Sequence, residues 1–290
     1  MTPEQHSDHL ITALKSLNLP KKEVDHRLKQ INDAKPNNSS NTISRRYYNL
    51  AHEIKSLCYL QQFGSIAPSL DYLHTPGCDM ILNDRYQIEF VCASPGDKTD
   101  KSGYDRFSIL NMKGSMFGDY AEKERFIFSR ITSALWEKQR FYISHLPQGT
   151  VCAAKPYLIF LGLGALSLDM FAGSYGIELT GVLFGKGAPT ITIDGHGNVI
   201  SRGYFHNHSF LKYTGSPIDC NLFCTEEFRC VSGIIFSDAD LYDEYTTQNT
   251  WLFINPFADV KIHKKDFSGM IYWSADGNGD YTPRRKGRRV

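Results

Sequence analysis

Two carboxylates near residue 80 have the residue type and spacing of a metal site. Asp79 precedes the apolar run 80–82, and Glu89, ten residues later, interrupts a second apolar run at 88–93. A charge within a strand that otherwise looks buried needs a partner, and a hard cation is one that two carboxylates bind well. Taken alone, however, the pair fits a strand-edge Asp and a salt-bridged Glu better than a metal site.

The chain around these carboxylates predicts a β-hairpin. Residues 79–82 form its first strand, and Asn83-Asp84-Arg85 turns the chain. Residues 86–93 run back, and Ser94-Pro95-Gly96 ends the second strand, because proline cannot continue a ladder of backbone hydrogen bonds. A hairpin of this length brings Asp79 close to the strand that carries Glu89.

A helix over residues 44–63 precedes the hairpin. Leu50 and Leu57 belong to its apolar stripe, and Glu53 lies three residues after the first and four before the second. Glu53 therefore borders the buried face instead of opposing it. A short strand at 69–73 connects this helix to the hairpin.

The second half of the chain predicts further helical and strand segments. A polar loop is expected at 97–120 and a long helix at 120–146, which carries Arg130 and Lys138. The continuous apolar run 156–162 is typical of a strand that is covered on both faces. Further strands are expected at 183–185, 190–193, 199–201, 231–237 and 250–254.

Composition limits the class of protein. Of the 290 residues, 41% are hydrophobic and 22% charged, with a formal net charge of +1, so any nucleic-acid surface must be a local patch. The seven cysteines contain no C-x-x-C pair, which favours reduced thiols, and no signal peptide or membrane-spanning run is visible. We expect a cytoplasmic protein that does not enter a membrane.

Three regions are expected. Residues 1–41 form an N-terminal helical appendage and linker, and residues 42–262 form the main domain. Residues 263–290 form a C-terminal tail that ends in a basic cluster without regular structure.

The order helix, strand, Asp-bearing strand, Glu-bearing strand, helix, strand resembles the restriction-endonuclease-like PD-(D/E)xK superfamily. Three further sequences resemble a less-studied bacterial branch of it: the Pro-Gly exit after the Glu strand, Arg-Ile-Thr-Ser-Ala-Leu-Trp-Glu-Lys at 130–138, and Asn-Pro-Phe-Ala at 255–258. The resemblance covers roughly residues 44–260. It implies an α/β fold whose core is a central mixed β-sheet flanked by helices.

The resemblance also implies roles for individual residues. Asp79 and Glu89 would bind Mg²⁺ or Mn²⁺, with Glu53 supporting a ligand or a second ion. Arg130 would bind phosphate, although an ion pair with Glu137 is slightly favoured for it. Lys138 would contact the nucleophile or the scissile phosphate.

One position departs from the superfamily pattern. The E-x-K lysine is replaced by Val91. Because some members carry the lysine on the following helix, Lys138 is the candidate, and an ordinary surface lysine is an equal alternative. Lys98 and Lys101 are further candidates.

Together these features predict a Mg²⁺-dependent nuclease that hydrolyses DNA phosphodiester bonds, with a role in restriction or anti-phage defence. RNA is an alternative substrate, and a homodimer is compatible with the sequence. The alternative function is a catalytically inactive nuclease-fold protein that acts as a nucleic-acid-binding or protein-interaction module, which the missing E-x-K lysine and the near-neutral charge favour.

Overall fold

The computed structural model describes residues 2–35, 44–68, 77–93, 118–163, 175–211, 216–275, 281–285 and 288–289. Its helices are α1 (Pro3–Ser16), α2 (Lys21–Ala34), α3 (Arg45–Leu60), α4 (Gly118–His145) and α5 (Tyr175–Phe184), with short 3₁₀ turns η1 (Gln61–Phe63), η4 (Leu222–Cys224), η5 (Glu226–Phe228) and η6 (Lys264–Phe267). Its strands are β1 (Ile66–Ala67), β2 (Met80–Leu82), β3 (Tyr86–Cys92), β4 (Tyr157–Gly162), β5 (Lys186–Ile193), β6 (Val199–His206), β7 (Ser209–Leu211), β8 (Pro217–Asp219), β9 (Val231–Ser237), β10 (Thr250–Ile254), β11 (Ile271–Ala275), β12 (Tyr281–Arg285) and β13 (Arg288–Arg289).

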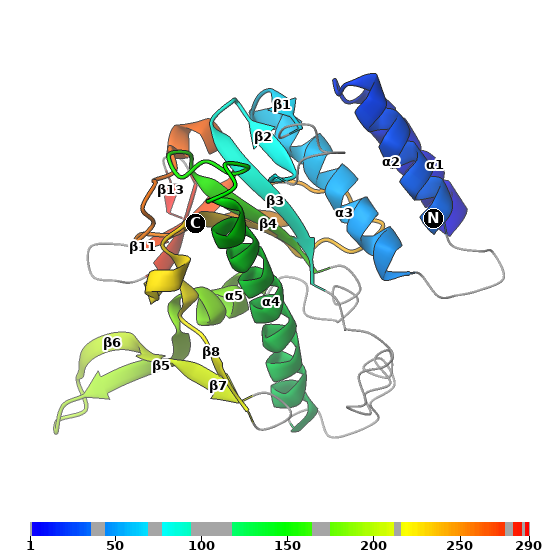
Figure 1. Cartoon of the computed structure of the whole chain (residues 1–290). Coiled ribbons are helices and arrows are strands. Elements are labelled where there is room, and N and C mark those ends of the chain that lie inside the picture. The colour runs from blue at the N-terminus through cyan, green and yellow to red at the C-terminus, as the bar shows by residue number, and fades with distance from the viewer. Residues whose placement is uncertain are drawn as a thin grey trace.

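The predicted α/β class with a central mixed sheet is confirmed (Figure 1). Nine of the described strands form one sheet in the order β1-β2-β3-β4-β9-β10-β11-β12-β13. β2 is antiparallel to both β1 and β3, while β3, β4 and β9 run parallel to one another. Parallel neighbours need a crossover connection, and the segments that contain α4 and α5 provide the two crossovers.

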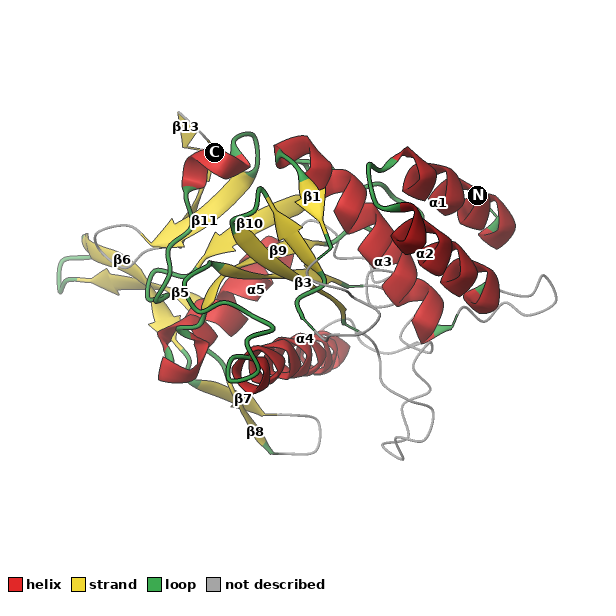
Figure 2. Cartoon of the chain, turned by 45° about the horizontal axis from the view of Figure 1, so that its top comes forward, coloured by secondary structure: helices red, strands yellow, loops and turns green. Residues whose placement is uncertain are grey.

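The two faces of β3 belong to different cores. Ile88, Phe90 and Cys92 belong to the core under α1, α2 and α3. Val91 and Ala93 point to the other face, where they join the core under α4 and α5. Because side chains alternate along a strand, Glu89 faces α4 as well. Figure 2 shows α3 and α4 on either side of β3.

The predicted hairpin turn is confirmed, and it is tied to the end of α3. Asn83 and Asp84 adopt the left-handed backbone region, which Asn and Asp tolerate better than most residues. The Asn83 amide accepts from the Ser65 backbone N–H and donates to the Phe63 carbonyl, at 2.9 and 3.0 Å. Gly64 has φ +148°, and a Cβ there would lie 1.8 Å from Asn83 Oδ1, so only glycine fits between helix and hairpin.

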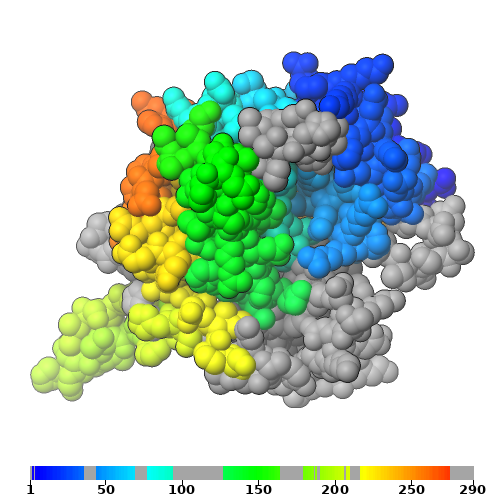
Figure 3. All heavy atoms as spheres, in the orientation of Figure 1, coloured from blue at the N-terminus to red at the C-terminus, as the bar shows by residue number. Residues whose placement is uncertain are grey.

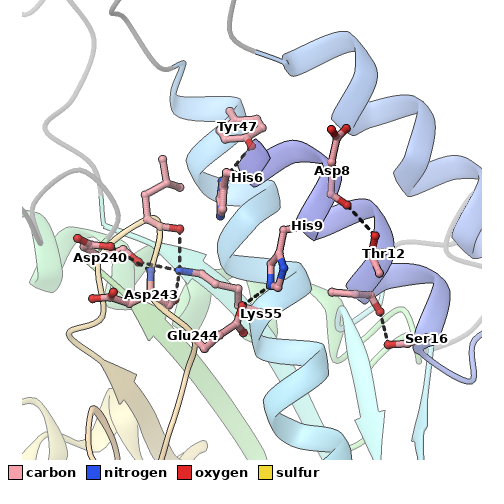
Figure 4. A network of polar contacts seen from close by, with 12 residues as sticks. His6, Asp8, His9, Thr12, Ser16, Tyr47, Lys55, Asp240, Asp243 and Glu244 are labelled. Carbon is pink, nitrogen blue, oxygen red and sulfur yellow. Dashed lines mark hydrogen bonds and ion pairs between the residues drawn. The ribbon is translucent and has the colours of Figure 1, made fainter. Parts of the chain in front are cut away.

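The N-terminal helices are part of the fold and not an appendage to it. Leu10 and Leu14 of α1 and Ile31 of α2 are at most 1% exposed and belong to the core that α3 covers. Polar contacts join α1 and α3 to the loop at 238–249, between β9 and β10 (Figure 4). His9 Nε2 of α1 lies 2.6 Å from Glu244 Oε1 of this loop. The buried Lys55 ammonium donates to three carbonyls of the same loop, those of Asp240, Leu241 and Asp243, at 2.7, 3.2 and 3.0 Å. These contacts hold α3 in place along the sheet.

Residues 263–290 are not a separate tail either. β11 pairs parallel with β10, in the register Trp251↔Ile271 and Phe253↔Trp273. The Trp273 ring stacks on the Phe253 ring with centroids 5.8 Å apart, and β12 and β13 continue the sheet. The segment Ile271–Ala275 contains Ile, Tyr and Trp, which favour strands, and its pairing with β10 places it in the sheet.

Most of the other predicted elements are confirmed, with small shifts at their ends. The strand expected at 183–185 is wrong, because Leu183 and Phe184 close helix α5. The strand expected at 69–73 lies outside the described residues, as does most of the loop expected at 97–120. β5 and β6 form a projecting hairpin, with exposed Ile191 and Ile200 (Figure 1). No helix among the described residues is long and apolar enough to cross a bilayer.

Candidate metal centre

Asp79 immediately precedes β2 and is held against β3. Its Oδ2 accepts the backbone N–H of Phe90 at 2.7 Å, a contact across the hairpin that the antiparallel pairing of β2 and β3 produces. A carboxylate that accepts a backbone N–H has little rotational freedom. The hairpin therefore fixes one carboxyl group beside the residue that follows Glu89.

Glu89 is 1% exposed and lies in the middle of β3. Its Oε2 accepts from the Lys138 ammonium at 2.5 Å. Its Oε1 is buried, and no donor among the described residues reaches it when both carboxyls are ionised; when one of them is protonated, Glu89 and Asp79 hydrogen-bond each other. A buried acceptor without a donor costs on the order of 1–3 kcal/mol, so this oxygen needs a proton or a cation.

The pKa values of Asp79 and Glu89 indicate the same need for a proton or a cation. The pKa of Glu89 is raised to about 8, first by burial and then by the neighbouring Asp79, against the opposing effect of Lys138. Burial likewise raises the pKa of Asp79, and Glu53 adds to the shift, while Lys138 and the Phe90 N–H oppose it. Two close carboxylates cannot both be ionised easily, so this pair favours a shared proton or a bound cation at neutral pH.

Lys138 reaches this pair from α4. Burial lowers the pKa of its ammonium, but Glu89 and Asp79 outweigh that effect, and the net shift is upward. The Lys138 carbonyl accepts the hydroxyl of the fully buried Tyr157 at 3.0 Å, which ties this turn of α4 to β4. Val91 is on the same face as Glu89 and packs among apolar side chains. An ammonium therefore reaches Glu89 from the helix that covers β3, and not from β3 itself.

Glu53 is near Asp79 but has a different partner. It forms an ion pair with Arg27 of α2, whose side chain is 1% exposed. Arg27 also pairs with Glu23 at 2.6 Å, one helical turn earlier. The sequence interpretation missed Arg27, although the Glu-x-x-x-Arg spacing on α2 marks an intrahelical pair.

The remaining predicted residues are less informative. Arg130 lies two turns before Lys138, roughly 12 Å along the helix axis, and its phosphate-binding role stays a prediction. Lys98 and Lys101 lie outside the described residues. Asn255, from the Asn-Pro-Phe-Ala sequence, is fully buried and donates to the carbonyls of Phe228 and Val231 at 3.0 and 2.8 Å. That sequence therefore has a structural role.

The ligand set can be compared with what a metal ion needs. In the described part of the chain, no group of three or more His, Cys, Asp or Glu side chains is arranged to hold a metal ion. Mg²⁺ commonly uses only one or two carboxylates and keeps several waters, so Asp79 and the unpartnered Glu89 Oε1 fit that ion.

No disulfide forms among the seven cysteines, all of which are described. No family model, curated protein or solved structure matches the chain.

Proposed function

We propose that this protein is a Mg²⁺-dependent nuclease with a restriction-endonuclease-like core. The observation that carries the proposal is the convergence of Asp79, Glu89 and Lys138, in which one buried carboxylate oxygen of Glu89 has no donor. Asp79 precedes β2, Glu89 lies in β3 and Lys138 lies in α4, and the three residues are therefore assembled only by the fold.

The topology supports the same assignment. Helix α3 is followed by the antiparallel strands β1, β2 and β3, then by α4 and by β4 parallel to β3. This order is similar to the one on which the sequence resemblance rests, except that β1 lies at Ile66–Ala67, whereas the first strand was expected at 69–73, outside the described residues. The site lies where β2 meets β3, which is the place that the resemblance assigns to the acidic residues.

The chemistry follows from the residue types. A divalent ion held by Asp79 and Glu89 would polarise the phosphate and lower the pKa of a bound water. The Lys138 ammonium remains charged beside these carboxylates and can stabilise the negative charge that develops on the phosphate oxygens. Asp79, fixed by the Phe90 N–H, and Lys138, fixed by Glu89, need little rearrangement to do this.

A cleavage assay tests the proposal. Purified protein is incubated with labelled duplex DNA, single-stranded DNA and RNA, with Mg²⁺, Mn²⁺ or EDTA. Asp79→Asn, Glu89→Gln and Lys138→Met should each lower the cleavage rate at least a hundredfold. Asp84→Asn, a fully exposed aspartate in the same hairpin, is the matched control and should cleave at the wild-type rate. Cleavage that survives both Asp79→Asn and Glu89→Gln would refute the site.

The second candidate is a catalytically inactive nuclease-fold protein. The observations that favour it are the Lys138–Glu89 ion pair, which already satisfies Oε2, and the engagement of Glu53 by Arg27. Titration calorimetry with Mn²⁺ separates the two functions, because the inactive protein needs no ion. Absence of both Mn²⁺ binding and cleavage would favour the inactive protein, and gel filtration with an oligonucleotide would then test the DNA-binding and homodimer predictions.

A further inference from the structure

The projecting hairpin of β5 and β6 has one mainly apolar face and one polar face. Side chains alternate between the two faces of a strand, and directly paired residues share a face. The register of β5 and β6 therefore places on one face Ile191, Ile193, Val199 and Arg202, and on the other Thr190, Thr192, Ser201 and Gly203. We call the first set the isoleucine face.

The isoleucine face is open to solvent. Figure 3 shows the hairpin, in yellow-green, extending away from the rest of the chain. Ile191, Ile193 and Val199 are 59%, 56% and 48% exposed, and Ile200, the extra residue where the register shifts, is 65% exposed. Strict alternation of apolar and polar residues is typical of a sheet that has one covered face. The hairpin therefore has the sequence of a strand pair whose isoleucine face is covered.

The turn of the hairpin is fixed by its own side chains. Asp194 Oδ1 accepts the backbone N–H groups of His196 and Asn198 at 2.9 and 2.8 Å, and Oδ2 accepts the Asn198 side-chain amide at 3.0 Å. The hydrogen bonds from Asn198 and from the turn lower the pKa of Asp194. A two-stranded hairpin is only marginally stable in water, so a partner on its apolar face would stabilise it. A fixed turn and an uncovered apolar face together suit a docking arm.

The charge of the hairpin argues against two kinds of partner. Residues 187–205 contain two charged side chains, Asp194 and Arg202. Such a segment offers no cationic track for a polyanion such as nucleic acid. The tip at 194–198 is polar and has no basic residue apart from His196, so it does not suit a membrane surface. The remaining partner class is a protein surface.

The positions of the two charges favour a second copy of this chain. Asp194 is at the tip, three residues beyond Ile191, which pairs with Arg202, so the two charges lie roughly 10 Å apart along the hairpin. In a two-fold, antiparallel contact of two hairpins, each Arg202 can meet Asp194 of the second copy. The axis then passes beside Ile193 and Val199. Apolar residues meet at the centre of this contact and opposite charges at its rim, as in other protein interfaces.

The size of the face fits a weak dimer. Ile191, Ile193, Val199 and Ile200 together expose roughly 400 Å², within the range of the largest apolar patch on a typical monomer. A specific interface buries about 800 Å² per partner, and the exposed Arg202 and the strand backbones add to the apolar area. The contact therefore belongs at the small end of specific interfaces, and we expect Kd in the micromolar range.

We propose that the isoleucine face docks on the same face of a second copy of this chain, with the two hairpins antiparallel. The inference does not use the candidate metal centre, so it fails or succeeds separately from the nuclease proposal. It assigns a surface to the homodimer with which the sequence is compatible.

Sedimentation equilibrium of the purified chain, from about 1 to about 200 μM, measures the Kd of the dimer. Ile193→Asn should raise Kd about thirtyfold or more, because each dimer loses two apolar contacts near its axis. Thr192→Asn is the matched control: it introduces the same amide one residue earlier, on the polar face, and should stay within about threefold of wild type. Arg202→Gln should raise Kd about fivefold at low salt and less in about 1 M NaCl, because salt screens charges at a rim.

Hydrogen–deuterium exchange supplies a measurement that needs no variant. In wild type, the backbone amides of residues 190–193 and 199–204 should exchange more slowly at about 200 μM than at about 1 μM. Four outcomes overturn the inference: a monomer at the highest concentration; a dimer whose hairpin amides exchange at the monomer rate; an unchanged Kd in Ile193→Asn with a wild-type melting temperature; and an unchanged Kd in Arg202→Gln at low salt.

Discussion

Glu89→Gln tests the electrostatics of the carboxylate pair most directly. The pKa of Glu89 is about 8 in the folded protein, against an ordinary value of 4.5. Between these two values the folded state keeps a proton that the unfolded state releases, so the free energy of unfolding must fall as pH rises. One proton changes it by at most about 1.4 kcal/mol per pH unit, which gives roughly 3 kcal/mol between pH 5 and pH 7.5.

The variant removes this dependence because glutamine does not titrate. Its amide also keeps an oxygen for Lys138 and gains an N–H₂ group for Asp79. Urea unfolding in EDTA, followed by tryptophan fluorescence from pH 5 to pH 8, should show wild type losing roughly 3 kcal/mol relative to Glu89→Gln.

Buried groups that do not interact with Glu89 contribute equally to the pH profile of both proteins, so the difference between the two proteins cancels their contributions. Burial lowers the pKa of His52 to about 3, so its effect on stability appears below pH 6.5. Burial lowers the pKa of Lys55 to about 8, so its effect appears above that pH. Glu137→Gln, an exposed change on α4, is the control and should follow wild type.

A bound divalent ion should offset the loss of stability that wild type shows as pH rises. At pH 8, Mn²⁺ at one hundred times its Kd should stabilise wild type by about 2.7 kcal/mol and Glu89→Gln much less. The reasoning would be refuted by a difference between the two proteins that stays constant from pH 5 to pH 8, since Glu89 would then titrate alike in both states.

Three further substitutions test neighbouring parts of the fold. Lys138→Met should abolish cleavage and also destabilise the metal-free protein by about 3 kcal/mol at pH 8, because Glu89 loses its cation, while urea unfolding at pH 5 should change less. Gly162→Ala places a Cβ 2.5 Å from His52 Nδ1 and should lower stability by about 1–3 kcal/mol, and a wild-type melting temperature would contradict the packing. Asn255→Ala leaves two buried carbonyls without donors and should cost about 3 kcal/mol with no effect on Mn²⁺ affinity, which calorimetry would check.

The positions of Asp79 and Glu89 were predictable because their surroundings are local. The turn residues Asn83 and Asp84 and the alternating strands specify a hairpin, and a hairpin fixes the register between its two strands. The helices that became α3 and α4 were predictable for the same reason, since their apolar periodicity is contained within each segment. The strand expected at 183–185 failed because a short apolar run fits a buried helix end equally well.

The partners of the charged residues were not predictable in this way. Lys138 reaches Glu89 only because α4 crosses over β3 on the face to which odd-numbered residues of that strand point. Arg27 reaches Glu53 only because α2 packs on α3, although the two residues lie in segments that the sequence assigned to different regions. Residue types and local periodicity were enough to identify the charged residues and the elements that hold them. Which charges meet depends on tertiary packing, because burial removes water and leaves each charge dependent on the neighbour that packing provides.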